Sequence, residues 1–198
     1  MVLKYFLFIN AVIIFCRLFV ETLNFSRWVH DFETLAYKIN PDHIHLIFQP
    51  GKSSNYSEIM QTIKRNFSRD CNDLIFNRSF IRNLNSYRRR FESSPVLLQN
   101  SLNRELKQGF SGDKYDLVNI RFLEIFENHL LKLNSLRDEY HSKIRNTVFH
   151  FKWQKSFHVW IIENEIALFE KIDYIRHQSL HHKYDNNSFL FVSENYLN

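Results

Sequence analysis

The chain has 198 residues, of which 44% are hydrophobic and 24% are charged, a balance that excludes a wholly disordered protein. Its 3 glycines and 3 prolines exclude collagen-like and low-complexity sequences and favour long helices over a many-turned β-sandwich. The 2 cysteines cannot build a disulfide framework and fit a reducing, cytoplasmic compartment, and the net charge of +5 permits an acidic partner without identifying one.

The first predicted element is a helix over residues 3–25. The segment YFLFINAVIIFCRLFV, residues 5–20, is strongly apolar and follows a single basic residue, Lys4. Its uninterrupted part ends at Arg17 and is shorter than the roughly 20 residues that span a membrane, and no small-residue cleavage site follows. We therefore interpret it as an amphipathic-to-buried helix. A signal peptide or membrane anchor is the alternative.

A pair of strands comes next. Residues 34–39 alternate loosely between apolar and polar side chains, and Pro41-Asp42 is a turn signal. The segment HIHLIF, residues 43–48, is rich in strand-forming residues and ends at Pro50-Gly51. These features predict two strands joined by a short turn.

A second helix is predicted from Asn55 to about Asn72, because Asn55 and Glu58 have the spacing of a capping box. The expected apolar stripe consists of Tyr56, Ile59, Ile63 and Phe67. The basic residues off this stripe are Lys64, Arg65 and Arg69. They could follow the phosphates of a nucleic acid, or they could form an ordinary solvated face.

Residues 77–148 differ in character from their surroundings and are predicted to form a helical insertion. Apolar residues at helical spacing predict a long helix over about 115–145. Beyond the insertion, a strand is expected within Ser156–Ile162, and Asn164 is placed to cap a last helix that reaches about Gln178. The tail after His181 is polar and is predicted to be irregular.

Two small patterns carry chemistry. His43 and His45 are two apart on a predicted strand, so both imidazoles project to the same side and could supply half of a metal site. Tyr174 and Gln178 are four apart on the last helix, so they share one face. They lie off the apolar stripe of that helix, which consists of Leu168, Ile172 and Ile175. Half-exposed histidines without a ligand and an ordinary surface tyrosine are the structural alternatives.

Four segments in order give these patterns a common meaning: PDHIHLIFQPG from residue 41, SEIMQTIKRNFSR from residue 57, FKWQKSFH from residue 151 and EKIDYIRHQ from residue 170. Together they resemble the IS200-like and REP-associated single-tyrosine transposases, which belong to the HUH endonucleases, where U is a bulky apolar residue. The resemblance covers about residues 3–76 and 149–198, and the insertion is not needed for it.

The resemblance implies an α+β fold: a ferredoxin-like antiparallel sheet with helices on one face. It also implies one HUH transposase-like domain over residues 1–198, interrupted by the insertion at about 77–148. Members of the family usually begin with a strand, whereas this chain enters its first helix almost at once. The first strand is therefore expected to be missing. Val159-Trp160 and Gln178-Ser179 also depart from the family pattern.

The resemblance further implies a site. Tyr174 matches the nucleophile, and His43, His45 and Gln178 match the ligands of a divalent metal, Mg²⁺ or Mn²⁺. Lys155, together with Lys64, Arg65 and Arg69, is expected to contact DNA.

The implied function is that of a DNA transposase that cleaves and rejoins single-stranded DNA through a 5′-phosphotyrosine intermediate. Its expected partners are single-stranded DNA with a hairpin and a second copy in a homodimer, without a small-molecule cofactor or a membrane. Two alternatives stay open: a truncated, inactive DNA-binding remnant of the same family, and a membrane-anchored or secreted protein.

Overall fold

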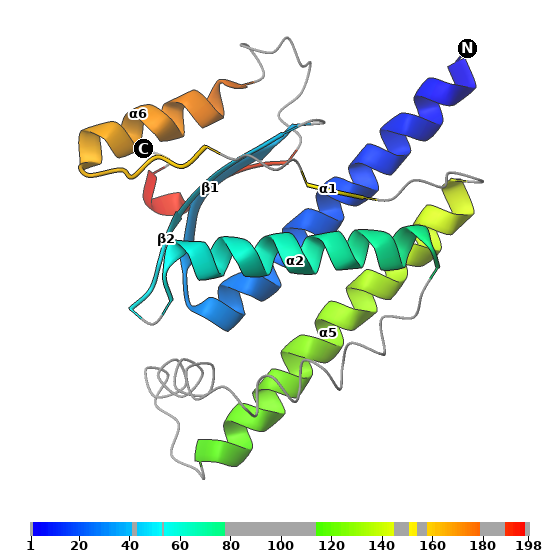
Figure 1. Ribbon diagram of the computed structural model, residues 1–198, viewed down its shortest axis with the longest axis horizontal. Coiled ribbons are helices and arrows are strands. Elements are labelled where there is room, and N and C mark those ends of the chain that lie inside the picture. The colour runs from blue at the N-terminus through cyan, green and yellow to red at the C-terminus, as the bar shows by residue number, and fades with distance from the viewer. Residues whose placement is uncertain are drawn as a thin grey trace. The chain divides into compact units, whose positions relative to one another are not determined.

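The computed structural model describes residues 2–40, 43–52, 54–77, 114–144, 151–153, 158–178 and 189–196. They form helices and a small antiparallel sheet, so the predicted α+β class is confirmed (Figure 1). In chain order the elements are α1 (Val2–His30), β1 (Glu33–Ile39), β2 (Ile44–Gln49), α2 (Tyr56–Ile75), α5 (Lys114–Lys143), α6 (Glu165–Arg176), β3 (Leu190–Val192) and the 3-10 turn η1 (Glu194–Tyr196). α1 begins at the first described residue, so the missing first strand stays a prediction.

The chain divides into two compact units. The first consists of residues 1–31 and 50–153, and the second of residues 32–49 and 154–198. The division does not follow the ends of the predicted insertion, residues 77–148, and many of those residues lie outside the described ones. A single domain with an insertion therefore stays a prediction.

The first unit is built from α1, α2 and α5, which confirms the helices predicted over residues 3–25 and 115–145. Aromatic side chains join the helices: Phe19 of α1 meets Phe67 of α2 edge to face, and Phe25 meets Phe126 of α5 in the same way. None of the helices in the described ranges is long and apolar enough to cross a membrane. Cys16 and Cys71 are both buried, and neither is part of a disulfide.

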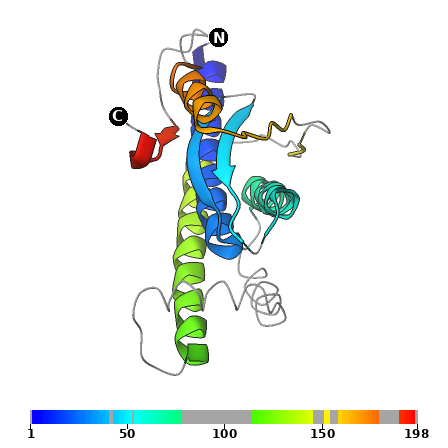
Figure 2. The ribbon, with the colours of Figure 1, turned by 90° about the vertical axis from the view of Figure 1, so that its left-hand side faces the viewer.

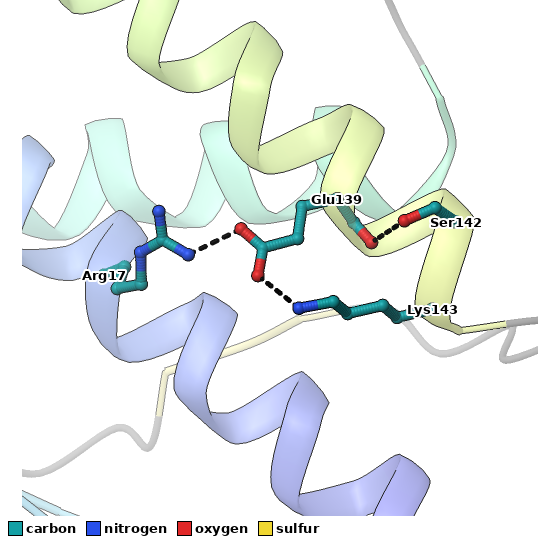
Figure 3. Close-up of polar contacts among 4 residues, drawn as sticks. All are labelled: Arg17, Glu139, Ser142 and Lys143. Carbon is teal, nitrogen blue, oxygen red and sulfur yellow. Dashed lines mark hydrogen bonds and ion pairs between the residues drawn. The ribbon is translucent and has the colours of Figure 1, made fainter.

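An ion-pair network ties α1 to α5 in this unit. The carboxylate of Glu139 accepts from Arg17 of α1 and, at 2.8 Å, from Lys143 one turn later on α5 (Figure 3). Ser142 donates its hydroxyl to the Glu139 backbone carbonyl. The hydrogen bond from Lys143 is the main cause that lowers the pKa of Glu139, and Arg17 adds to it. The network is exposed, so it orients the two helices more than it stabilises them.

α2 begins as the sequence predicts and ends later. Asn55 and Glu58 form the capping box, with Asn55 Oδ1 accepting from the Glu58 backbone and the Glu58 carboxylate accepting from the Asn55 backbone. Ile59, Ile63 and Phe67 are buried, whereas Tyr56 is exposed because it lies in the first turn of the helix.

The second unit contains the sheet, with strand order β2-β1-β3 and both pairs antiparallel. α6 begins at the Asn164 cap, as predicted, and packs on the sheet (Figure 1); Figure 2 shows the same elements from the side. The small core between them centres on Ala36, Ile172 and Ile175. Partly buried apolar side chains close it: Ile47, Leu168, Leu190, Val192 and Tyr196.

Two predictions about the chain after the insertion are wrong. The described residues 158–162 form no strand, and Ile161 is 81% exposed. The second edge of β1 instead pairs with β3, which comes from the tail predicted to be irregular. β3 carries three consecutive apolar residues, and Phe191 stacks on Tyr37 of β1, which compensates for its shortness.

A buried carboxylate in α2 makes the stability of the first unit depend on pH. Asp70 is 1% exposed, and burial raises its pKa from 3.8 to about 6 although Arg69 pairs with it. Between these values the folded chain holds the proton more tightly than the unfolded chain, so stability falls as the pH rises through this window. Above pH 6 the ionised group costs roughly 3 kcal/mol, at about 1.4 kcal/mol per pKa unit.

We therefore expect Asp70→Asn to raise the free energy of unfolding by about 1–3 kcal/mol at pH 8 and by much less at pH 4. Denaturant unfolding at both pH values measures this. Asp138→Asn is the matched control, because Asp138 pairs in the same way with Arg137 but is exposed. Equal gains for Asp70→Asn at the two pH values would contradict the assignment.

Candidate metal and nucleophile site

The hairpin of β1 and β2 turns both histidines toward α6. Ile47 of β2 packs against the α6 core, and alternation along the strand places His45 and His43 on the same face. Their Nε2 atoms are 3.0 Å apart, and their rings meet edge to face with centroids 4.8 Å apart. The sequence prediction that both imidazoles project together is consistent with this geometry.

α6 brings the other two predicted residues to the pair. The ring of Tyr174 lies edge to face against His45, with centroids 5.6 Å apart, and Tyr174 is 43% exposed. Gln178 lies just beyond the helix end and is 0% exposed. Tyr174 is thus open to a large substrate, whereas Gln178 faces the protein interior.

Asn40, which the sequence analysis did not single out, joins these groups. Its Nδ2 lies 3.0 Å from His43 Nε2 and donates to Gln178 Oε1 at 3.3 Å. Contacts therefore run without a break from Tyr174 through the two histidines and Asn40 to Gln178. All five residues belong to the second unit.

The strand register could have revealed Asn40. Across the hairpin, Lys38 pairs with His45, and the backbone N–H of Asn40 donates to the carbonyl of His43. Residues directly opposite on an antiparallel pair share a face, so Lys38 and Asn40 flank the histidines. Lys38 is 2% exposed.

The donor set fits a divalent cation of magnesium's size. Two orphaned buried atoms, Gln178 Nε2 and Asn40 Oδ1, have no hydrogen-bond partner among the described residues. The 3.0 Å between His43 Nε2 and His45 Nε2 is a hydrogen-bond distance, and it is also the separation of neighbouring ligands around an octahedral ion at about 2.1 Å. The described residues contain no cluster of three or more His, Cys, Asp or Glu side chains; the polar groups next to the imidazoles are the carboxamides of Asn40 and Gln178.

The residues predicted to contact DNA lie elsewhere in the chain. Lys64, Arg65 and Arg69 are on α2, in the first unit, and Lys155 lies outside the described residues. Lys64 Nζ is 5.8 Å from the centre of the Trp153 ring, and Arg69 pairs with Asp70. Arg65 is exposed.

Comparison with known protein families gives a match over part of the chain. Residues 22–101 match the family model described as transposase IS200-like. The matched range includes the hairpin with its two histidines, but neither α6 nor Tyr174. No curated protein and no solved structure matches the chain. The match confirms the resemblance seen in the sequence and supports a transposase in general terms.

Proposed function

From the similarity of residues 22–101 to IS200-like transposases, we propose that the chain cleaves and rejoins single-stranded DNA, with Tyr174 as the nucleophile. The observation that carries the proposal is the contact of the Tyr174 ring with His45, in a row of polar groups that ends at Gln178. The hairpin residues and the α6 residues are far apart in the sequence, and the fold brings the Tyr174 ring beside one of two histidines that share a face.

The proposed reaction is a transesterification. The phenol oxygen of Tyr174 attacks the scissile phosphorus, the bond from phosphorus to the 3′ oxygen breaks, and the phenol proton is lost while the 3′ oxygen gains one. The products are a 5′-phosphotyrosine and a free 3′-OH. Because the covalent link keeps the phosphodiester energy, the strand can be rejoined without ATP. The exposure of Tyr174 supports access by a DNA strand.

His43, His45 and Gln178 would hold a divalent ion, Mg²⁺ or Mn²⁺, and Mn²⁺ suits the imidazole nitrogens better. Held by these residues, the ion would supply polarisation of the phosphate and stabilisation of negative charge in the transition state. Lys38, which pairs with His45 across the hairpin, lies buried on the same face. Lys64, Arg65 and Arg69, with Lys155, are proposed to contact DNA phosphates, and a homodimer stays a prediction.

The experiment uses hairpin-bearing single-stranded oligonucleotides in the presence of Mn²⁺. With a label at the 3′ end, we expect the label to move with the protein on a denaturing gel. With a label at the 5′ end, we expect a released fragment that a polymerase can extend from its 3′-OH. If tight binding to the oligonucleotides occurs with no adduct for any of them, the chain is a non-catalytic DNA-binding relative.

A further inference from the structure

Asn40 connects the histidines of the β1–β2 hairpin with Gln178 at the end of α6. It follows β1, is 4% exposed, and its Nδ2 contacts both His43 Nε2 and Gln178 Oε1. These two acceptor atoms are the ones that the proposed function assigns to a divalent ion. The NH₂ group of the Asn40 carboxamide can donate to both acceptors because its hydrogens carry partial positive charge. In this respect it occupies the place that a cation would take.

The other end of the same carboxamide is unsatisfied. Asn40 Oδ1 is buried and has no hydrogen-bond partner among the described residues. A buried carbonyl oxygen without a partner costs about 1–3 kcal/mol, so it is retained where it serves a purpose. The oxygen and nitrogen of a carboxamide have nearly the same size, and a half-turn about the Cβ–Cγ axis exchanges their places.

We propose that Asn40 is a further ligand of the divalent-cation site and that its carboxamide turns over when the cation binds. After the half-turn, Oδ1 lies where Nδ2 lies now, beside His43 Nε2 and Gln178 Oε1. Two carbonyl oxygens about 3.3 Å apart repel each other unless a cation attracts both, so the turned state requires the ion. The ligand set becomes two imidazoles and two carboxamides. This inference rests on the proposed function.

Two substitutions separate a ligand from a group that only positions Gln178. Asn40→Asp keeps an inward oxygen and adds charge, but cannot donate a hydrogen bond to Gln178. Asn40→Leu has a similar shape and neither property. We measure Mn²⁺ affinity of the full chain by the electron paramagnetic resonance signal of free Mn²⁺. We expect Asn40→Leu to weaken binding about tenfold or more, and Asn40→Asp to bind at least as tightly as wild type.

Asn164→Asp is the matched control, because it adds the same charge to the second unit at the α6 cap, where an aspartate still accepts from Ala167. It should leave Mn²⁺ affinity unchanged. Equal weakening by Asn40→Asp and Asn40→Leu would overturn the ligand role, and so would wild-type affinity in Asn40→Leu. An Asn40→Leu chain that does not fold leaves the aspartate variant as the deciding comparison.

A measurement on the unaltered chain is independent of folding defects. Titration with Mg²⁺ is expected to shift the side-chain NH₂ signals of Asn40 in a nitrogen–proton NMR spectrum, since the group leaves its two acceptors. An unchanged Asn40 signal at saturating Mg²⁺ would overturn the turnover. If His45→Ala binds Mn²⁺ as tightly as wild type, the cation site itself is wrong, and the proposed function fails along with this inference. If only the Asn40 results are negative, the proposed function stands.

Discussion

Tyr174→Phe is expected to abolish the covalent protein–DNA adduct while changing single-stranded DNA affinity by only a few fold. The substitution removes one oxygen, which is the atom that would attack phosphorus, and no other side chain could form a phosphotyrosine at this position. The ring remains, so its edge-to-face contact with His45 is kept. The labelled oligonucleotide on a denaturing gel measures the adduct, and fluorescence anisotropy measures the affinity.

The control for this variant is Tyr196→Phe. Tyr196 lies in the same unit and its ring packs edge to face on Phe169 of α6, but it does not contact the histidines among the described interactions. It should form the adduct at the wild-type rate. An adduct in Tyr174→Phe would show that another residue is the nucleophile. Loss of the adduct in both variants would point to a disturbed α6 instead of missing chemistry.

Local patterns predicted the elements that frame the site. The strands β1 and β2 pair as expected, and the Asn164 side chain caps α6, whereas the predicted turn at Pro41-Asp42 lies outside the described residues. Both predictions depend on interactions within a few residues, which the sequence displays directly. The same holds for the shared side of His43 and His45, because strand alternation alone decides it.

Features that depend on distant partners could not be predicted in the same way. Residues 158–162 have the composition of a strand but pair with none in the described part of the chain, while Leu190–Val192 pairs with β1 because an edge was open there. Strand propensity describes a fit to a half-buried surface, and the sequence does not say which surface is available. Gln178 lies off the apolar stripe of α6 in the sequence pattern but is fully buried in the structure, where its Oε1 accepts a hydrogen bond from the distant Asn40.

His45→Ala is expected to weaken Mn²⁺ binding by about 100-fold or more and to remove adduct formation with it. The substitution takes away one of two imidazoles and with it the contact between His45 Nε2 and His43 Nε2. The paramagnetic resonance titration measures the first effect and the gel measures the second. High Mn²⁺ concentrations should restore part of the cleavage, because the nucleophile is intact.

Comparison with Tyr174→Phe separates the two roles. Tyr174→Phe should keep Mn²⁺ affinity and lose the adduct at every metal concentration, whereas His45→Ala should lose affinity and regain some adduct as the metal increases. His177→Ala is the matched control, because this exposed histidine is next to Gln178 but pairs with Asp173 on the surface. Wild-type Mn²⁺ affinity in His45→Ala would refute the metal site. If adduct formation in that variant also did not depend on the Mn²⁺ concentration, Tyr174 would have to act without an ion.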